Sequence, residues 1–529
     1  MTTSRRGARF GAAFVLGGAG FFALIARGEH GVAATPEPVA AGTPLATVAG
    51  AAVSATFIER PPEPEWVVRY TVPAGVLPVD ECASKATIES PGVARPESTA
   101  PTPAPPPTAE PGPPPAETAG MVRVDTTAGA LNEQLPEPIR ARLGFGAPFD
   151  VSTIAPEPLR GRTEDLARVR AVLAKAERRE GHTRLSFWGA SHVAGEYFTG
   201  DLRRILQDRY GDAGHGFVMP AAPFTGYRGT DVNLCTGGSW TTDFHNRKGG
   251  RDDGLFGPGG MSVEALAPTS YGWVQTTKTN PHGRAVTRFE LLYLRQAGGG
   301  AIDVHVDSTD PIRVPTGVRS AAAQGPGAAV FSVSEGPHRL AVSAAGDGPV
   351  RIFGAYMERD VPGVIVDAMG VSGRTAASWL AWDADLQAAY LGRRPVDLAV
   401  LAYGTNEAND RGLSEDEYRA TLRKVLTRMR RVLPDAACVL IGPSDRGRKI
   451  TGNTYAIWSH TAWVARTQRE IGPEFGCATW DLQEASGGPG SMLRWWGATP
   501  QLAAGDLIHF TAAGYRELAT RFAAALDAL

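Results

Sequence analysis

The sequence has few cysteines and no cluster of charge of one sign. Its four cysteines contain no CxxC pair, which argues against a structural zinc site and against a dense disulfide framework. Lys and Arg total 53, Asp and Glu total 55, and no run rich in Lys and Arg occurs, so no broad nucleic-acid-binding surface is expected. Apolar residues make up 43% of the chain, which is typical of a globular protein. The 529 residues suffice for roughly two to four domains.

Only one long apolar stretch is present, and it lies at the N-terminus. Residues 1–9 contain three arginines and are followed by an uncharged, mostly apolar segment, residues 10–26. This pattern is typical of an export signal and is marginal for a spanning helix. Small residues at Val32 and Ala34 fit cleavage after Ala34. Uncleaved, the segment would anchor the protein with its bulk outside the cytoplasm. We therefore expect residues 1–34 to be a signal peptide or membrane anchor, and the protein to lie in the periplasm or cell envelope.

The next part of the chain is rich in alanine and proline. Residues 91–115 are dense in proline and nearly free of large apolar side chains, so they cannot bury a core and are expected to be extended. A short apolar patch at residues 66–72 could form a small strand but predicts no domain. We expect a disordered spacer over residues 35–120 and a lead-in segment with a helix over residues 121–183.

From residue 184 onward, short apolar runs alternate with helical patterns. Strands are expected at residues 185–188, 363–369, 396–403, 437–442 and 477–481, and helices at residues 196–210, 376–391, 414–432, 455–471 and 511–528. Apolar runs separated by helices are typical of a parallel sheet covered on both faces. The right-handed crossover rule then favours a flavodoxin-like, doubly wound α/β fold.

One long segment interrupts this alternation. Residues 230–359 are rich in glycine and contain short stretches in which apolar and polar residues alternate. The segment is far too long for a connection between a strand and a helix. Its pattern is typical of an antiparallel β-sandwich. We therefore predict an all-β domain inserted into an α/β domain that is formed by residues 184–229 and 360–529.

Polar residues follow the predicted strands at the edge where functional groups gather in doubly wound folds. They are Ser191 after the first strand, Gly373 after the second, Asn406 after the third, and Asp506 with His509 before the last helix. Ser191 offers a nucleophilic hydroxyl, His509 can take its proton, and Asp506 can orient the imidazole. The N–H groups of Ser191 and Gly373 and the Asn406 amide can stabilise an oxyanion. The pattern predicts an acyl-transfer site that requires neither a metal nor an organic cofactor.

These four blocks, in this order, resemble the SGNH (GDSL-type) hydrolase family. The segments WGASHVAGEYFTGDLRRILQDRYGDAGHGFV and LAYGTNEA, together with the long β insertion, are similar to the peptidoglycan O-acetylesterase branch. The resemblance covers about residues 184–229 and 363–529. It implies an exported serine esterase that removes O-acetyl groups from a cell-wall polysaccharide, with peptidoglycan as the expected substrate. The family usually has Asp before the nucleophile, where this chain has Ala190, which affects the rigidity of the turn more than the type of reaction.

Two other functions stay open on the sequence alone. The same site could transfer the acetyl group to a sugar hydroxyl instead of water, because the difference lies in the acceptor that the pocket favours. This would make the protein an O-acetyltransferase. The protein could also be a non-catalytic wall-binding protein that displays the β-sandwich on a tethered spacer. In each case the expected partner is an acetylated glycan and not a nucleic acid.

Several histidines and acidic residues have weaker patterns. Asp303, His305 and Asp307 alternate along one predicted strand and would share a face. A solvated strand face is favoured there over a metal site. His192 is interpreted as structural, because side chains that are neighbours at such a turn are expected to point apart.

Cysteines and tryptophans leave alternatives open. Cys438 and Cys477 lie in predicted strands and are expected to be buried thiols, although an exported location permits a disulfide. Trp495 and Trp496, shortly before the Asp-x-x-His block, could stack on a sugar or pack the core. The same choice applies to Trp240 and Trp273 of the insertion.

Overall fold

The structure is a computed structural model that describes residues 63–78, 82, 87–89, 121–124, 149–251, 253–278, 280–451 and 454–529. The predicted signal or anchor and most of the predicted spacer lie outside these residues. The described residues belong to one compact unit, Pro62–Leu529. Within this described part of the chain, no helix has both the length and the apolar character that crossing a membrane requires.

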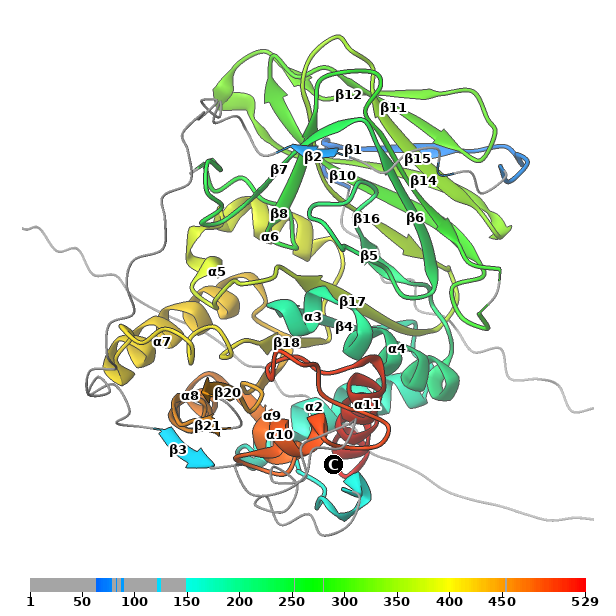
Figure 1. Cartoon of the computed structure of the whole chain (residues 1–529). Helices are drawn as coiled ribbons and strands as arrows, with labels where there is room; N and C mark the ends of the chain where they lie inside the picture. Colours follow the sequence, from blue (N-terminus) through cyan, green and yellow to red (C-terminus); the bar gives the residue numbers. More distant parts are fainter. Residues whose placement is uncertain are drawn as a thin grey trace, which may run out of the picture. The chain divides into compact units, whose positions relative to one another are not determined.

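A five-stranded parallel sheet forms the lower half of the molecule (Figure 1). In spatial order its strands are β17 (Gly363–Gly370), β4 (His182–Gly189), β18 (Leu398–Ala402), β19 (Ala437–Ile441) and β22 (Cys477–Trp480). Numbered along the chain, this order is 2-1-3-4-5, which is that of flavodoxin-like sheets. The predicted α/β fold is confirmed.

Helices cover this sheet in two groups. The first group is α2 (Thr163–Glu177), α4 (Tyr197–Tyr210) and α11 (Ala512–Asp527), which contact one another; the second is α5 (Ser378–Ala381), α6 (Ala384–Gly392), α7 (Glu415–Val432) and α8 (His460–Ile471). Local sequence sets these boundaries, as α7 illustrates. The Ser414 hydroxyl accepts from the Glu417 N–H while the Glu417 carboxylate accepts from the Ser414 N–H, a reciprocal capping box.

Short elements complete the lower half. They are α3 (Ser191–Ala194), α9 (Leu482–Ala485), α10 (Ser491–Trp496), the 3-10 helices η1 (Val151–Thr153) and η3 (Gly472–Phe475), and a small sheet of β20 (Gly447–Thr451), β21 (Thr454–Trp458) and β3 (Met121–Val124). A further 3-10 helix, η2 (Ala321–Ala323), lies in the insertion. The predicted helix over residues 455–471 is wrong in its first part. Residues 454–458 are rich in β-branched and aromatic side chains and pair with β20, so the helix begins only at His460.

Two mainly antiparallel sheets form the upper half and contain the predicted β insertion (Figure 1). The larger sheet consists of β1 (Val67–Thr71), β14 (Gly325–Gly336), β10 (Val286–Ala297), β16 (Val350–Glu358), β8 (Met261–Ala265), β7 (Ser239–Phe244) and β2 (Thr87–Glu89), with β13 (Gly317–Val318) beside β10 and β5 (Gly216–Val218) beside β16. The smaller sheet consists of β12 (Ile312–Pro315), β11 (Ala301–Val306), β15 (Arg339–Ala344), β9 (Tyr271–Thr276) and β6 (Val232–Gly237). Apolar side chains of both sheets belong to one buried cluster, so the sheets pack as a sandwich.

Part of the predicted spacer belongs to this sandwich. The patch at residues 67–71 forms β1 and pairs in parallel with β14, with Val67 opposite Ala328. A disulfide joins Cys82 to Cys235 on β6. The short strand considered for residues 66–72 is thus present. The expectation of a disordered spacer over residues 35–120 did not include its pairing with the sandwich or the disulfide of Cys82, because these partners lie far along the chain.

The other two cysteines also form a disulfide. Cys438 on β19 and Cys477 on β22 are opposite each other in the parallel sheet, with Cα atoms 4.4 Å apart. The expectation of buried free thiols is wrong, because register places the two sulfur atoms side by side.

A buried ionic cluster joins the insertion to the parallel sheet. Glu358 ends β16, is 1% exposed and contacts Arg184 of β4, Arg288 of β10 and Arg394, whose Nε lies 2.8 Å from Glu358 Oε1. Arg184 Nη1 also lies 2.8 Å from Asp367 Oδ1 on β17. Burial alone would raise the pKa of Glu358, but the arginines hold it well below its usual range. The cluster fixes the sandwich against β4, the strand that leads to Ser191.

Candidate active site

A hydrogen-bonded chain of three side chains lies at the carboxyl end of β4. Ser191 is the first residue of α3 and is half-buried. Its hydroxyl donates to His509 Nε2 over 2.7 Å, and His509 Nδ1–H donates to Asp506 Oδ2 over 2.6 Å. The fold thus brings together two segments that are 318 residues apart. In this arrangement the imidazole can take the serine proton while the carboxylate stabilises the resulting imidazolium.

Asp506 also organises the turn that carries His509. Its Oδ1 accepts from the backbone N–H groups of Ile508 and His509, each over 3.0 Å. Leu507 adopts a left-handed backbone conformation with φ of 58°, which lets the chain turn between the acid and the histidine. Burial alone would raise the pKa of Asp506, but the hydrogen bonds from His509 and the backbone hold it below its ordinary value. The carboxylate therefore stays ionised and keeps the imidazole oriented.

The turn that carries Ser191 is held without an acidic side chain at position 190. Ala190 is buried, and its carbonyl accepts from the N–H groups of Val193 and Ala194 over 3.1 and 2.9 Å. A Cβ at the preceding Gly189 would lie 2.4 Å from Val193 Cγ2 and 2.7 Å from the Ala402 carbonyl. Close packing and backbone hydrogen bonds thus fix the turn at the position where the family that the sequence resembles usually has Asp.

Gly373 and Asn406 lie in neighbouring loops, after β17 and β18. Gly373 has φ of +74°, a left-handed conformation that favours glycine. The Asn406 Nδ2–H donates to the carbonyl of Arg374, the residue that follows Gly373, over 2.7 Å. An amide nitrogen carries two N–H groups, so this bond leaves a second one for a substrate oxygen. The structure therefore joins the two loops that the sequence assigns to an oxyanion hole.

Glu407 is a site residue that the sequence reasoning missed. Its buried carboxylate accepts from the Gly404 N–H over 3.0 Å and from the Ala376 N–H over 2.8 Å. Burial raises the pKa of this carboxyl, and the backbone N–H groups oppose that rise. Glu407 ties the loop of Asn406 to the loop of Gly373. Its position directly after Asn406 was the available signal.

His192 contacts the predicted catalytic histidine. Its Nδ1 lies 2.8 Å from the Tyr515 hydroxyl, its Nε2 lies 3.1 Å from Ser444 Oγ, and its ring centroid is 5.2 Å from that of His509. Burial, and then the nearby His509, lower the pKa of His192 to about 3. The neutral His192 ring thus supports His509. The sequence indicates a structural role for His192 but does not predict its contact with His509.

The tryptophans considered for sugar stacking are mostly core residues. Trp495 is fully buried and donates to the Ser486 carbonyl over 2.8 Å, whereas Trp496 is half-buried beside Tyr455. Trp240 is also buried, and its indole N–H donates to the Gly237 carbonyl over 3.1 Å. A sugar-stacking role is therefore wrong for Trp495 and Trp240, since core packing covers their faces.

The acidic residues of β11 and of the turn that follows it do not gather around one point. Asp303 pairs with Arg313 at 3.0 Å, and Asp307 is buried against His338, with 2.7 Å between Oδ2 and Nδ1. His305 Nδ1 lies 3.2 Å from the Thr309 carbonyl. Among the described residues, no group of three or more His, Cys, Asp or Glu side chains is arranged to hold a metal ion.

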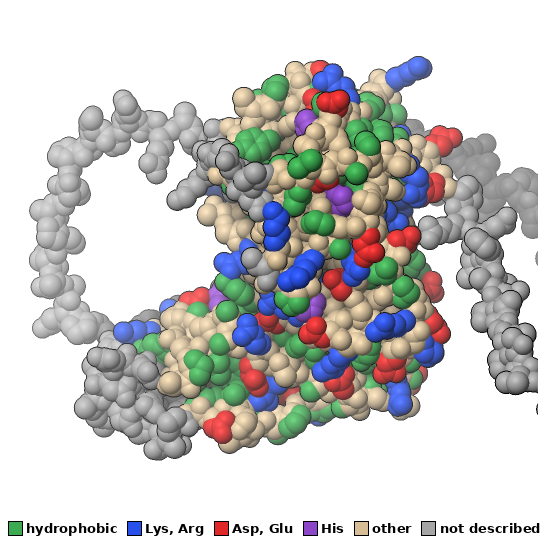
Figure 2. Space-filling view, turned by 90° about the vertical axis from the view of Figure 1, so that its right-hand side faces the viewer, with side chains coloured by type: hydrophobic (Ala, Val, Ile, Leu, Met, Phe, Trp, Pro, Cys, Tyr) green, Lys and Arg blue, Asp and Glu red, His purple; other side chains and the backbone are tan. Residues whose placement is uncertain are grey.

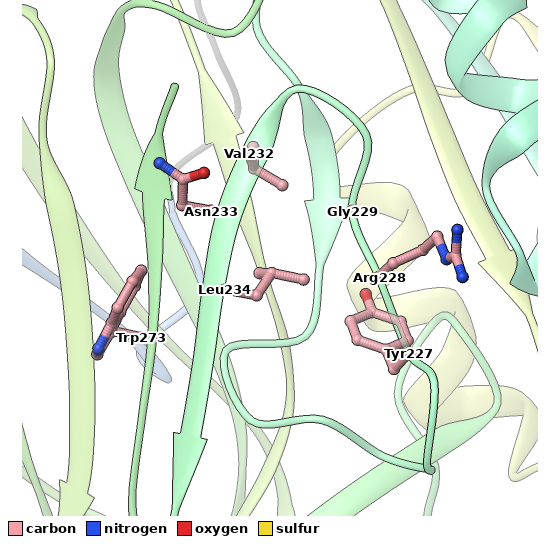
Figure 3. Close-up of a pocket in the computed structure, with 7 residues that line it drawn as sticks. All are labelled: Tyr227, Arg228, Gly229, Val232, Asn233, Leu234 and Trp273. Atoms are coloured by element: carbon pink, nitrogen blue, oxygen red, sulfur yellow. The ribbon is translucent and has the colours of Figure 1, made fainter. Parts of the chain in front are cut away.

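An open groove lies on the sandwich where β6 and β9 meet the connection between β5 and β6 (Figure 3). Its volume is about 450 Å³, and it is lined by Tyr227, Arg228, Gly229, Val232, Asn233, Leu234 and Trp273. Val232 and Leu234 project from β6 toward Tyr227, and Trp273 lies on the other side of β6 (Figure 3). Trp273 is only 6% exposed, and the Arg339 guanidinium lies over its ring, 4.1 Å from the ring centre.

Comparison with known proteins matches one protein family. Residues 322–517 match the GDSL-like lipase/acylhydrolase family. This range contains Gly373, Asn406, Asp506 and His509, whereas Ser191 precedes it because the insertion separates the first block from the others. No curated protein matches the chain.

Solved structures give a further match. A peptidoglycan O-acetylesterase is 24% identical over 70% of this chain and 98% of its own, with a TM-score of 0.58. A family two carbohydrate esterase from Cellvibrio japonicus is 14% identical over 56% of this chain and 98% of its own, with a TM-score of 0.22. A family two carbohydrate esterase from Clostridium thermocellum is 11% identical over 50% of this chain and 94% of its own, with a TM-score of 0.23. Only the first of these TM-scores indicates a common fold.

Proposed function

We propose that this chain, an esterase of the SGNH (GDSL-like) hydrolase family, removes O-acetyl groups from cell-wall peptidoglycan. The observation that carries the proposal is the hydrogen-bonded chain from Ser191 through His509 to Asp506, beside the loops of Gly373 and Asn406. The fold shared with a peptidoglycan O-acetylesterase supports this choice of substrate.

The first half of the reaction forms an acetyl-enzyme. Ser191 Oγ attacks the acetyl carbonyl carbon while His509 Nε2 takes the hydroxyl proton. The carbonyl oxygen becomes an oxyanion, for which the N–H groups of Ser191 and Gly373 and the Asn406 amide are the donors. The carbon–oxygen bond to the sugar then breaks, and the sugar oxygen takes the proton from His509.

The second half releases acetate. His509 takes a proton from water as the water oxygen attacks the acetyl carbon on Ser191. The new tetrahedral intermediate collapses, the bond to Ser191 Oγ breaks, and His509 returns the proton to the serine. A sugar hydroxyl in place of water would instead transfer the acetyl group.

The proposed compartment is the periplasm or cell envelope, with residues 1–34 as export signal or anchor. Both disulfides, Cys82–Cys235 and Cys438–Cys477, support this proposal because disulfides persist in oxidising compartments.

Acetate release from O-acetylated peptidoglycan tests the proposed function. The wild-type protein should release acetate, Ser191→Ala should release almost none, and Ser334→Ala, at an exposed position of β14, should match the wild type. The glycan products are analysed by mass spectrometry at the same time. If acetyl groups move to another sugar and no acetate is released, the reaction is acetyl transfer and not hydrolysis. Binding of peptidoglycan without any loss of acetyl groups would refute both reactions.

A further inference from the structure

Two arginines beside the triad have no ion-pair partner among the described residues. Arg374 follows Gly373 in the loop after β17, and Arg446 lies in the segment after β19. Both side chains are half-buried. The buried arginines of the cluster around Glu358 are paired with carboxylates, whereas these two arginines beside the triad are not. A half-buried guanidinium without an anion loses hydration that nothing replaces.

Arg374 has only neutral groups around its guanidinium. Its Nη1 donates to the His245 carbonyl over 2.7 Å, and its guanidinium lies 5.2 Å from the centre of the Phe244 ring. Its Nε is buried and makes no hydrogen bond in the described structure. Burial lowers the pKa of Arg374, and no carboxylate offsets that effect. The backbone carbonyl of the same residue binds Asn406, so this charge belongs to the oxyanion loop.

Arg446 lies against the turn that carries Asp506 and His509. The neighbouring Gly447 N–H donates to the Leu507 carbonyl over 3.0 Å. Asp506 is the nearby acid, but its oxygens already accept from His509 and from two backbone N–H groups. Burial and the exposed Arg448 both lower the pKa of Arg446. A second positive charge next to Arg446 makes this side of the site more favourable for an anion.

The sheet order places the two arginines on opposite sides of the nucleophile. β4, which leads to Ser191, has β17 with the Arg374 loop on one side and β18 then β19 with the Arg446 segment on the other. Three strand spacings separate β17 from β19, or about 14 Å. The two loops therefore start on opposite sides of Ser191, where a polymer that lies across the site would meet both. Figure 2 shows Lys and Arg side chains gathered where the upper and lower halves of the molecule meet.

We propose that Arg374 and Arg446 bind carboxylates of the glycan on either side of the scissile acetyl ester. The enzyme therefore selects a carboxylate-bearing acetylated polymer over a neutral one. Guanidinium and carboxylate can form two parallel, charge-assisted hydrogen bonds, which suit groups that the protein leaves unpaired. This assignment rests on the proposed esterase function and narrows its substrate class.

The test compares one acetylated glycan in two charge states. O-acetylated peptidoglycan fragments with free carboxylates are assayed beside the same fragments after conversion of the carboxylates to amides. For the wild type, kcat/KM should fall about tenfold on amidation, a loss typical of a hydrogen bond to a charged group. The ratio of kcat/KM for the free-carboxylate fragments to kcat/KM for the amidated fragments should fall toward one in Arg374→Gln and in Arg446→Gln. Arg446→Lys, which keeps the positive charge, should retain part of the preference for the free carboxylates. Rising salt should lower kcat/KM for the anionic fragments only.

Arg319→Gln is the matched control. Arg319 is exposed and lies next to β13, which pairs with the end of β10 remote from Glu358. The ratio of kcat/KM values should be unchanged in this variant. A wild-type ratio near one would overturn the assignment while leaving the esterase function in place. A ratio that survives in both glutamine variants, with both substrates slowed alike, would show that the arginines only stabilise the loops. Hydrolysis of an aryl acetate without acetate release from either fragment would overturn the proposed function and this assignment with it.

Discussion

Replacing Glu358 by glutamine should weaken the junction between the sandwich and the parallel sheet. The Glu358 carboxylate is 1% exposed and contacts Arg184, Arg288 and Arg394. Glutamine has nearly the same shape but no charge. The substitution therefore leaves positive charges buried without their shared anion.

The expected cost follows from the partners that remain. Removing one member of a buried ion pair destabilises a protein by about 3–5 kcal/mol. Arg184 keeps Asp367 at 2.8 Å, and Arg394 keeps Glu290 at 2.7 Å, so only Arg288 loses its sole ion-pair partner. We therefore expect the lower end of the range, about 3 kcal/mol.

Denaturant unfolding followed by circular dichroism and tryptophan fluorescence measures this cost. Glu335→Gln is the matched control, because Glu335 pairs with Arg359 but is 49% exposed. Exposed pairs contribute between about 0 and 1 kcal/mol. Equal unfolding midpoints for the two variants would refute the idea that the buried cluster holds the junction.

The pH dependence gives a second check on the same residue. The arginines hold the pKa of Glu358 well below its usual range, so its contribution is complete above the ordinary Glu pKa of about 4.3. The contribution is lost as pH falls through the lowered pKa of the folded state. The stability difference between the wild type and Glu358→Gln should be constant from about pH 5 to 8 and shrink in stronger acid. A stability difference between the two proteins that grows in acid would contradict the conclusion that Glu358 is ionised in the folded protein.

Other predictions concern the site and the sheet. Asn406→Ala should lower kcat about 100-fold with little change in KM, measured with an acetyl ester; a change in KM alone would make Asn406 a substrate-binding residue. The His192 ring, with its pKa lowered to about 3, should stay neutral from about pH 5 to 8 in an NMR titration, and protonation in that range would contradict its role as a neutral support. The double variant Cys438→Ser, Cys477→Ser should lose about 3 kcal/mol of stability in denaturant unfolding, and an unchanged midpoint would show that the sheet needs no crosslink.

The parallel sheet was predictable because its strands are buried on both faces. Residues 363–366 and 437–441 form continuous apolar runs, and both become strands of the parallel sheet, β17 and β19. The insertion was predictable for a different reason, since alternating residues in 286–297 and 301–306 predict half-buried strands.

Features that depend on distant partners could not be read in the same way. β1 is short and polar in part, and it is a strand because residues 328–332 offer an open edge. Cys82 and Cys235 are 153 residues apart, and nothing in either local sequence identifies the other. The start of α8 was misplaced because residues 454–458 also fit a helical pattern until β20 pairs with them.

The residues of the candidate site were accessible through their order along the chain. Ser191, Asn406 and His509 each follow or precede an element whose end could be located from the sequence. Glu407 was missed because a charged residue in a loop is usually solvated, whereas here two backbone N–H groups hold it in the interior. The packing of His192 on His509 was missed because it depends on the close approach of α3 and the segment before α11.

Labelling with a fluorophosphonate, which reacts with activated serine hydroxyls, tests most directly whether Ser191 is the nucleophile and His509 its base. Peptide mass spectrometry of the labelled protein should find one label per chain, on Ser191, and labelling of His509→Ala should be slower by orders of magnitude. Ser334→Ala should be labelled like the wild type, since Ser334 is exposed on β14. A label on another serine, or full labelling of Ser191→Ala, would contradict the assignment of the nucleophile.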